Sequence, residues 1–209
     1  MISTLMCNNL IWLPSMNVGY YDVDPDTSKP DYFSIYVEYA KTPMGIGINN
    51  FRTKLVNKYI GNDPILDFGC SCGSFIQTRN KIHDHSSFGY DVQSTAVKYL
   101  QNEGLYLDPF SEDYIENISF WDSLEHLKHF DVVIKKVHKF VFLTIPIVKD
   151  MQHALISKHL KVKEHYWHFT EQGLIYVMNL LGFKFVAKDD TECTLGREDV
   201  LTFVFRKKS

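Results

Sequence analysis

Cysteines and long apolar runs are scarce in this chain. Four cysteines among 209 residues are too few for the disulfide framework of a secreted domain, which favours free thiols in a reducing compartment. No apolar run approaches the length that spans a bilayer, and the first residues carry no basic region of a signal peptide. We therefore expect a cytoplasmic protein with no membrane partner.

An excess of basic residues is also absent. The 22 Lys and Arg residues are outnumbered by 25 Asp and Glu residues, which gives a formal net charge of −3. A protein that binds nucleic acid without sequence preference usually has a basic surface, so a nucleic-acid partner is disfavoured. No HExxH motif or paired Cys/His motif surrounds His165 and His168, and we expect no metal.

One stretch, residues 64–75 (PILDFGCSCGSF), carries the strongest functional pattern. Its apolar run predicts a short buried strand, its small residues predict a tight turn, and Phe75 begins the apolar face of a helix. A strand, a glycine-bearing turn and a helix N-terminus form a corner where a nucleotide-type ligand can approach unpaired backbone N–H groups.

Two glycine spacings compete for this turn. A dinucleotide-binding loop would require glycine where Ser71 and Ser74 stand, so a nicotinamide oxidoreductase is disfavoured. The pattern Asp-x-Gly-x-Gly-x-Gly is matched by Asp67, Gly69 and Gly73, and only Ser71 departs from it. Serine is small, so we expect the loop to tolerate it, although serine adopts a positive φ less readily than glycine.

The rest of the chain alternates between strand and helix patterns. Residues 1–30 are rich in turn signals and contain a possible short hairpin, and two helical patterns follow, separated at Thr42–Pro43. Apolar strand patterns then recur between helical ones, which is typical of an α/β sheet. We predict an N-terminal extension or cap over residues 1–60 and one compact domain over residues 61–209.

Charged residues at three places have distinct predicted roles. Asp91 ends the strand after the glycine turn, where a carboxylate can accept hydrogen bonds from both ribose hydroxyls; the alternative is that it caps the helix starting near Ser94. Asp122 is predicted to be the N-cap of a helix with Glu125 at N3, as in a capping box. Arg52 is expected on the solvated face of the second helix.

Five segments resemble those of class I S-adenosylmethionine-dependent methyltransferases and occur in the same order: residues 64–75, 88–91, 120–127, 142–146 and 165–170. The Asp-x-x-Glu-His-Leu segment at 122–127 is most similar to the small-molecule branch of that family. The resemblance implies a Rossmann-like, mostly parallel seven-stranded sheet flanked by helices, with an antiparallel C-terminal edge strand. It also implies S-adenosyl-L-methionine as cofactor and direct in-line methyl transfer to a small-molecule or metabolite-like acceptor.

The resemblance further implies where the cofactor lies. Asp67 and the glycine turn would hold its methionine part, Asp91 its ribose and Val92 its adenine. The residues implied in cofactor binding are Asp67, Gly69, Cys70, Ser71, Gly73, Asp91, Val92, Trp121, Asp122 and Leu124. A reading of a different class remains open, namely a non-catalytic protein of the same fold that binds S-adenosylmethionine or a nucleoside.

No sequence motif identifies the residues that bind the methyl acceptor, and only individual candidates can be named. Direct displacement needs alignment, and a general base only if the acceptor is a poor nucleophile, so a catalytic residue is not defined. The candidates for a catalytic role are His126, His168 and Tyr21. We predict an acceptor pocket lined by Tyr20, Tyr21, Tyr166, Trp167 and His168. The alternative is that these aromatic side chains pack over the core.

Overall fold

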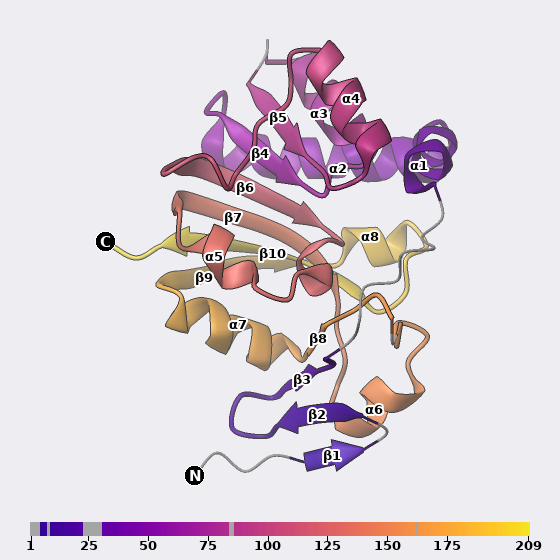
Figure 1. The fold of residues 1–209 in the computed structure, drawn as a ribbon, viewed down its shortest axis with the longest axis vertical. Coiled ribbons are helices and arrows are strands. Elements are labelled where there is room, and N and C mark those ends of the chain that lie inside the picture. The colour runs from indigo at the N-terminus through magenta and orange to yellow at the C-terminus, as the bar shows by residue number, and fades with distance from the viewer. Residues whose placement is uncertain (1–4, 8, 23–30, 84–85, 162) are drawn as a thin grey trace.

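A mixed β-sheet forms the centre of the computed structural model, which describes residues 5–7, 9–22, 31–83, 86–161 and 163–209. The described strands of this sheet are β4 (Ile65–Phe68), β5 (Ser87–Tyr90), β6 (Ile115–Trp121), β7 (Val137–Pro146), β9 (Phe183–Asp189) and β10 (Val200–Lys207). Their order is β5–β4–β6–β7–β10–β9 (Figure 1). β5, β4, β6 and β7 are parallel, and β10 is antiparallel to both of its neighbours.

The predicted α/β class is confirmed, but two details of the predicted sheet are wrong. The described residues form six strands in this sheet rather than seven, because Tyr106 makes only an isolated bridge to Gly89. The apolar run at residues 105–107 is short, because it lies between Gly104, which has φ +66°, and the turn at Asp108. The antiparallel strand β10 is also not the edge. Its residues are mostly buried whereas those of β9 are mostly exposed, so the more apolar strand takes the inner position.

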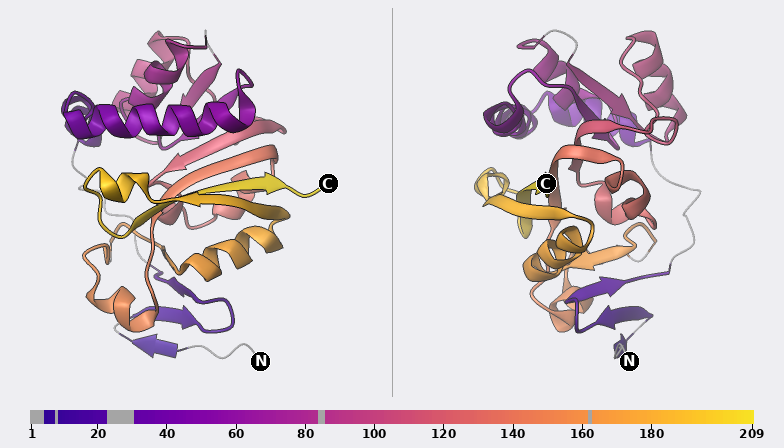
Figure 2. Two further views of the ribbon diagram at one scale, coloured as in Figure 1. Left: turned by 180° about the vertical axis from the view of Figure 1, so that it is seen from behind. Right: turned by 90° about the vertical axis from the view of Figure 1, so that its left-hand side faces the viewer.

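Helices cover both faces of the sheet. They are α1 (Tyr32–Ala40), α2 (Pro43–Ile60), α3 (Ser74–Asn80), α4 (Ser94–Asn102), α5 (Phe130–Ile134) and α7 (Glu171–Leu180). Alternation along β4 assigns Leu66 and Phe68 to the core that includes α5 and α7, and Ile65 to the core that includes α2, α3 and α4. The left panel of Figure 2 shows α2 lying across one face of the sheet.

A second, smaller sheet joins the N-terminal residues to a distant segment. Its order is β1 (Leu5–Cys7), β2 (Leu10–Leu13), β3 (Val18–Tyr20) and β8 (Trp167–Phe169). The antiparallel pair β2–β3 confirms the predicted hairpin, and β3 pairs in turn with β8. A helix, α6 (Met151–Ile156), packs beside this sheet around Trp12 and Tyr21. Residues 23–30 of the predicted extension lie outside the described residues.

Capping residues place the helices that flank the site. Thr42 accepts a hydrogen bond from the Gly45 N–H at the start of α2, and Thr170 does the same for Gly173 in α7. The predicted break between α1 and α2 is confirmed. No helix among the described residues is long and apolar enough to cross a membrane. The thiols of Cys70, Cys72 and Cys193 are free.

Candidate functional site

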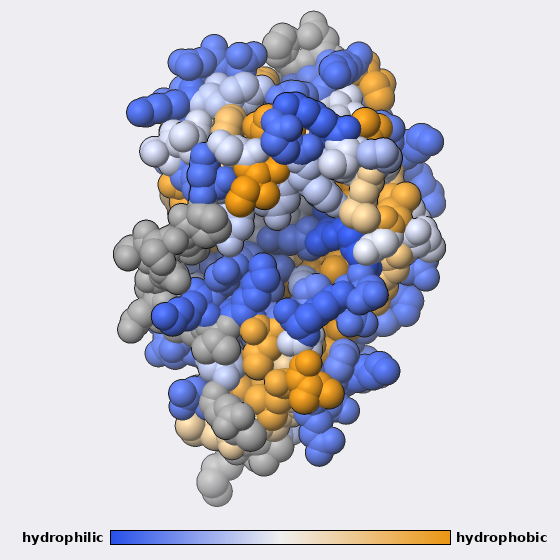
Figure 3. All heavy atoms as spheres, turned by 90° about the vertical axis from the view of Figure 1, so that its right-hand side faces the viewer, coloured by the Kyte–Doolittle hydropathy of each residue, from blue (hydrophilic) through white to orange (hydrophobic). Residues whose placement is uncertain are grey.

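A cleft of about 350 Å³ opens where the parallel strands β4, β5, β6 and β7 end. Figure 3 looks onto this side of the molecule and shows a hollow with hydrophilic side chains within it. In α/β sheets, ligands bind outside the carboxyl ends of the strands, because the loops that follow the strands converge there. The cleft is therefore the candidate functional site.

The turn between β4 and α3 forms one wall of the cleft. Gly69, Ser71 and Gly73 adopt φ values of +76°, +49° and +68°, so three alternate positions are left-handed. Ser71 takes this conformation although it is not glycine, and its hydroxyl donates to the carbonyl oxygen of Tyr32 at 3.3 Å. A Cβ at Gly69 would lie 2.6 Å from the Cβ of Ser123, so glycine is required there both by φ and by space.

Asp91 lies directly after β5, facing the same turn. Its Oδ2 accepts the backbone N–H of Ser71 at 2.8 Å, and its Oδ1 accepts that of Gln93 at 2.9 Å. Asp91 is therefore not the N-cap of α4, which is Gln93, although its side chain accepts the Gln93 N–H. Asp91 also lines the cleft, and its ribose role stays a prediction. A carboxylate has about four lone-pair sites, so two remain for a ligand.

Apolar surface beside Asp91 is available to a flat ligand. Val92 lines the cleft and is 76% exposed. Trp121, at the end of β6, packs its ring edge-to-face against Phe75 with centroids 5.3 Å apart. The indole Nε1 of Trp121 is buried and has no hydrogen-bond partner among the described residues. Cys70 also lines the cleft, and burial raises the pKa of its thiol well above the ordinary range.

Asp67 is a buried acid at the base of the cleft. Its side chain accepts a hydrogen bond from the Ser119 hydroxyl at 2.9 Å. Burial raises the pKa of Asp67 to about 7, outweighing the lowering effects of Ser119 and Arg52. This acid therefore carries its proton over part of the neutral pH range.

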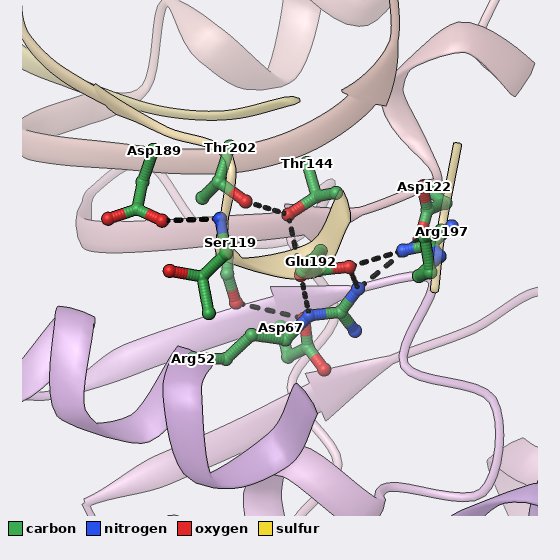
Figure 4. Close-up of polar contacts among 10 residues, drawn as sticks. Arg52, Asp67, Ser119, Asp122, Thr144, Asp189, Glu192, Arg197 and Thr202 are labelled. Carbon is green, nitrogen blue, oxygen red and sulfur yellow. Dashed lines mark hydrogen bonds and ion pairs between the residues drawn. The ribbon is translucent and has the colours of Figure 1, made fainter. Parts of the chain in front are cut away.

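An ion-pair network closes the cleft on the side of α2 (Figure 4). Arg52 donates through Nε to Glu192 Oε1 at 2.7 Å and through Nη2 to Asp122 Oδ2 at 3.3 Å. Arg197 contacts the same two acids, with its Nη1 2.8 Å from Asp122 Oδ2. Glu192 belongs to the short helix α8 (Thr191–Thr194) and also accepts the Thr144 hydroxyl at 3.1 Å. Two cations and two anions thus tie α2, α8 and the ends of β6 and β7 together.

The pKa values in this network follow from mutual stabilisation. Burial alone would lower the pKa of Arg52, but the carboxylates of Glu192 and Asp122 outweigh burial and raise it. Burial would likewise raise the pKa of Asp122, and Arg197 followed by Arg52 lowers it instead. Arg52 and Asp122 therefore keep their charges inside the protein.

Two sequence predictions about this network are wrong. Arg52 is not on a solvated face, since its side chain is 11% exposed. The buried face of α2 includes Ile48 and Val56, and Arg52 lies one turn from each, so helical spacing from these two residues is the signal that would have found it. Asp122 is not a helix N-cap. It has φ +58°, its side chain lies in the ion pairs, and a 3₁₀ turn, η1 (Leu124–His126), follows instead of an α-helix.

The segment at η1 brings two further predicted residues to the cleft. Glu125 is 2% exposed, and burial followed by the charge of Asp122 raises its pKa to about 8. His126 lines the cleft, and its Nδ1 lies 2.9 Å from the carbonyl oxygen of Glu164. The ring of His165 meets the ring of His126 edge-on, with centroids 4.5 Å apart.

Several predicted site residues do not line the cleft. Leu124 is fully buried in the core under the sheet. The indole of Trp167 donates to the carbonyl oxygen of Leu127, and Tyr21 is 3% exposed in the small core near α6. The residues of the predicted acceptor pocket that lie away from the cleft are Tyr20, Tyr21, Tyr166, Trp167 and His168. They lie on or next to the small sheet, as expected from the alternative that these aromatic side chains pack over the core.

Comparison with known proteins places this geometry in a fold family. No protein-family model matches the sequence, and no curated protein sequence matches it. Among solved structures, an S-adenosylmethionine-dependent methyltransferase from Archaeoglobus fulgidus has a TM-score of 0.59 at 14% identity, covering 84% of this chain and 100% of its own.

Two other solved structures extend the comparison. The magnesium protoporphyrin IX methyltransferase ChlM from Synechocystis PCC 6803, solved with bound SAH, has a TM-score of 0.57 at 10% identity over 90% of each chain. The [4+2]-cyclase SpnF has a TM-score of 0.56 at 12% identity over 77% of this chain and 80% of its own. The chain has the fold of class I S-adenosylmethionine-dependent methyltransferases.

Proposed function

We propose that this protein binds S-adenosyl-L-methionine in the cleft and transfers its methyl group to a small-molecule acceptor. The observation that carries the proposal is the contact between Asp91 and the Ser71 N–H. It joins a ribose-binding candidate to a glycine turn in which three alternate residues are left-handed. The solved methyltransferases of the same fold support it.

The residues in the cleft fit this cofactor. Asp91 has lone pairs for two ribose hydroxyls, and exposed Val92 offers an apolar face for a base. Two buried polar atoms, Asp122 Oδ1 and Trp121 Nε1, have no hydrogen-bond partner among the described residues. Buried polar atoms are normally paired, so these two favour a polar ligand at this wall. The turn from Gly69 to Gly73 would hold the methionine part.

When bound, S-adenosylmethionine supplies a methyl group on a positively charged sulfur, which an acceptor can displace in line. The task of the chain is then alignment. We assign the acceptor to the region of His126, Lys161 and Glu164, which line the same cleft with polar groups. This acceptor region replaces the acceptor pocket predicted from the sequence, which was to be lined by the aromatic residues of the small sheet.

A small acceptor suits the cleft, whose volume is at the lower end of the range for ligand pockets. The net charge of −3 disfavours a nucleic-acid acceptor. The Asp-x-x-Glu-His-Leu segment at 122–127 fits the small-molecule branch that it resembles. The free thiols of Cys70, Cys72 and Cys193 suit a reducing compartment such as the cytoplasm.

The second candidate function is cofactor binding without methyl transfer. Two of the catalytic candidates, Tyr21 and His168, lie away from the cleft. The name of the cyclase SpnF also indicates that the fold is used for chemistry other than methyl transfer.

Two measurements on the purified protein test these functions in turn. Isothermal titration with S-adenosylmethionine, its demethylated product and NADH should give saturable binding of the first two only. Methyl-labelled cofactor is then incubated with panels of small hydroxyl, carboxyl, amine and thiol acceptors, and transfer is measured. Binding with no transfer to any acceptor favours the second function, and NADH binding alone contradicts both.

A further inference from the structure

A cluster of three potential metal ligands lies in the wall of the cleft beyond the glycine turn. Glu125, His126 and His165 each offer one ligand atom, and these atoms lie within 4.8 Å of one another. All three residues line the cleft, and Glu125 and His165 are 2% and 4% exposed. The cluster joins η1 to a segment much later in the chain, so no local sequence motif marks it.

One carboxyl oxygen of Glu125 lacks the hydrogen-bond partner that a buried acid normally has. Its Oε2 is buried and has no hydrogen-bond partner among the described residues. A buried oxygen without a partner is uncommon in proteins and points to a ligand that supplies the missing contact.

The two histidines are arranged as metal ligands usually are. The Nδ1 of His126 contacts the carbonyl oxygen of Glu164 at 2.9 Å. Because a carbonyl oxygen only accepts, Nδ1 is the donor in this contact, and a bond of this kind commonly orients a metal-binding imidazole. The ring of His165 lies edge-on to the ring of His126, with centroids 4.5 Å apart, and His165 is buried in the same wall of the cleft.

Backbone contacts hold the two segments in register. The Tyr166 N–H donates to the carbonyl oxygen of Glu125 at 2.9 Å, while the His126 ring contacts the carbonyl of Glu164. The His165 N–H donates to the carbonyl oxygen of Lys161. These hydrogen bonds hold the backbone on both sides of the cluster. The fold itself therefore brings the three ligand atoms together.

We propose that Glu125, His126 and His165 bind one divalent transition-metal ion, such as Zn²⁺, with a coordination position open to the cleft. Two imidazoles and one carboxylate suit zinc, iron, cobalt or nickel, whereas Mg²⁺ and Ca²⁺ prefer oxygen ligands only. Ligand atoms about 2 Å from a tetrahedral ion lie roughly 3.3 Å apart, so small side-chain rotations close the observed spacing. Water, or a donor atom of a molecule in the cleft, would complete the coordination.

The test is to treat the protein with a chelator and then titrate it with metal ions. Binding of Co²⁺ is measured from the visible absorption of the bound ion, and binding of Zn²⁺ is measured by calorimetry. We expect one ion per chain. Glu125→Gln and His165→Gln should each weaken binding at least tenfold. His138→Gln, which changes an exposed histidine outside the cluster, should bind like the wild type.

Absence of saturable binding by the wild type overturns the proposal, and so does wild-type affinity in a folded Glu125→Gln variant. If His165→Gln does not fold by circular dichroism, Glu125→Gln decides alone, because glutamine matches the shape of the acid. The inference concerns the ion and not methyl transfer. Titration of S-adenosylmethionine into the chelator-treated protein shows separately whether the cofactor proposal fails.

Discussion

The carboxylate of Asp91 accepts a hydrogen bond from the backbone N–H of Ser71 at 2.8 Å. This contact joins the end of β5 to the one position of the glycine turn that departs from the Asp-x-Gly-x-Gly-x-Gly pattern. It explains how serine is held in a left-handed conformation that it adopts less readily than glycine.

Asp91→Ala should weaken S-adenosylmethionine binding by about 1.5–3 kcal/mol, since hydrogen bonds to a charged acceptor are worth this much. Calorimetric titration measures it. Asp108→Ala is the matched control, because Asp108 also accepts the N–H two residues later, at Phe110, but lies away from the cleft. An unchanged dissociation constant for a folded Asp91→Ala protein would contradict the ribose assignment.

Gly69→Ala should lower the free energy of unfolding more than Gly104→Ala does. Both glycines have a positive φ, which costs alanine about 1–2 kcal/mol. Only the Cβ at position 69 also meets Ser123, at 2.6 Å, whereas nothing lies within 4 Å at position 104. Urea unfolding of the two variants measures the difference. Equal losses of unfolding free energy in the two variants would contradict the prediction, because they would show that the contact between the new Cβ and Ser123 costs no stability.

Arg52→Met should destabilise the protein by about 1.5–3 kcal/mol, because the buried carboxylate of Glu192 loses one charged hydrogen-bond donor and keeps Arg197. The control is Lys54→Met, which changes an exposed residue of α2. It should change stability by no more than about 0.5 kcal/mol. Both are measured by urea unfolding at neutral pH. A loss at Arg52 as small as that at Lys54 would show that the network contributes little.

Asp67 should make stability depend on pH. Its pKa is raised from 3.8 to about 7 in the folded protein, so the folded state retains a proton that the unfolded state releases. Its contribution is therefore present below pH 3.8 and is lost as the pH rises to about 7. Relative to Asp67→Asn, the wild type should lose stability across this interval. Parallel pH profiles of the two proteins, without added ligand, would refute the shift.

The sequence predicted the parts of the fold that depend on local pattern. The apolar run at Ile65–Phe68, the break before Pro43 and the cap at Thr170 each act through neighbouring residues, and all three appear in the structure. The position of β10 inside the sheet depends instead on which strand is more apolar on both faces, and this is decided by pairing at long range.

The site shows the same limit. The glycine turn and Asp91 follow from local spacing, and the structure brings them to one cleft. Arg52, Glu192 and Arg197 come from segments far apart in the sequence, and charged residues are ordinarily assigned to solvent. Only tertiary packing shows that their charges neutralise one another inside the protein.

The central claim is that the cleft beside Asp91 holds S-adenosylmethionine. A crystal structure of the protein with saturating S-adenosylhomocysteine tests it most directly. We predict one molecule in the cleft, with both ribose hydroxyls within hydrogen-bonding distance of the Asp91 carboxylate and the amino-acid part against the turn from Gly69 to Gly73. Ligand bound elsewhere, or a cleft without ligand at saturating concentration, would contradict the claim.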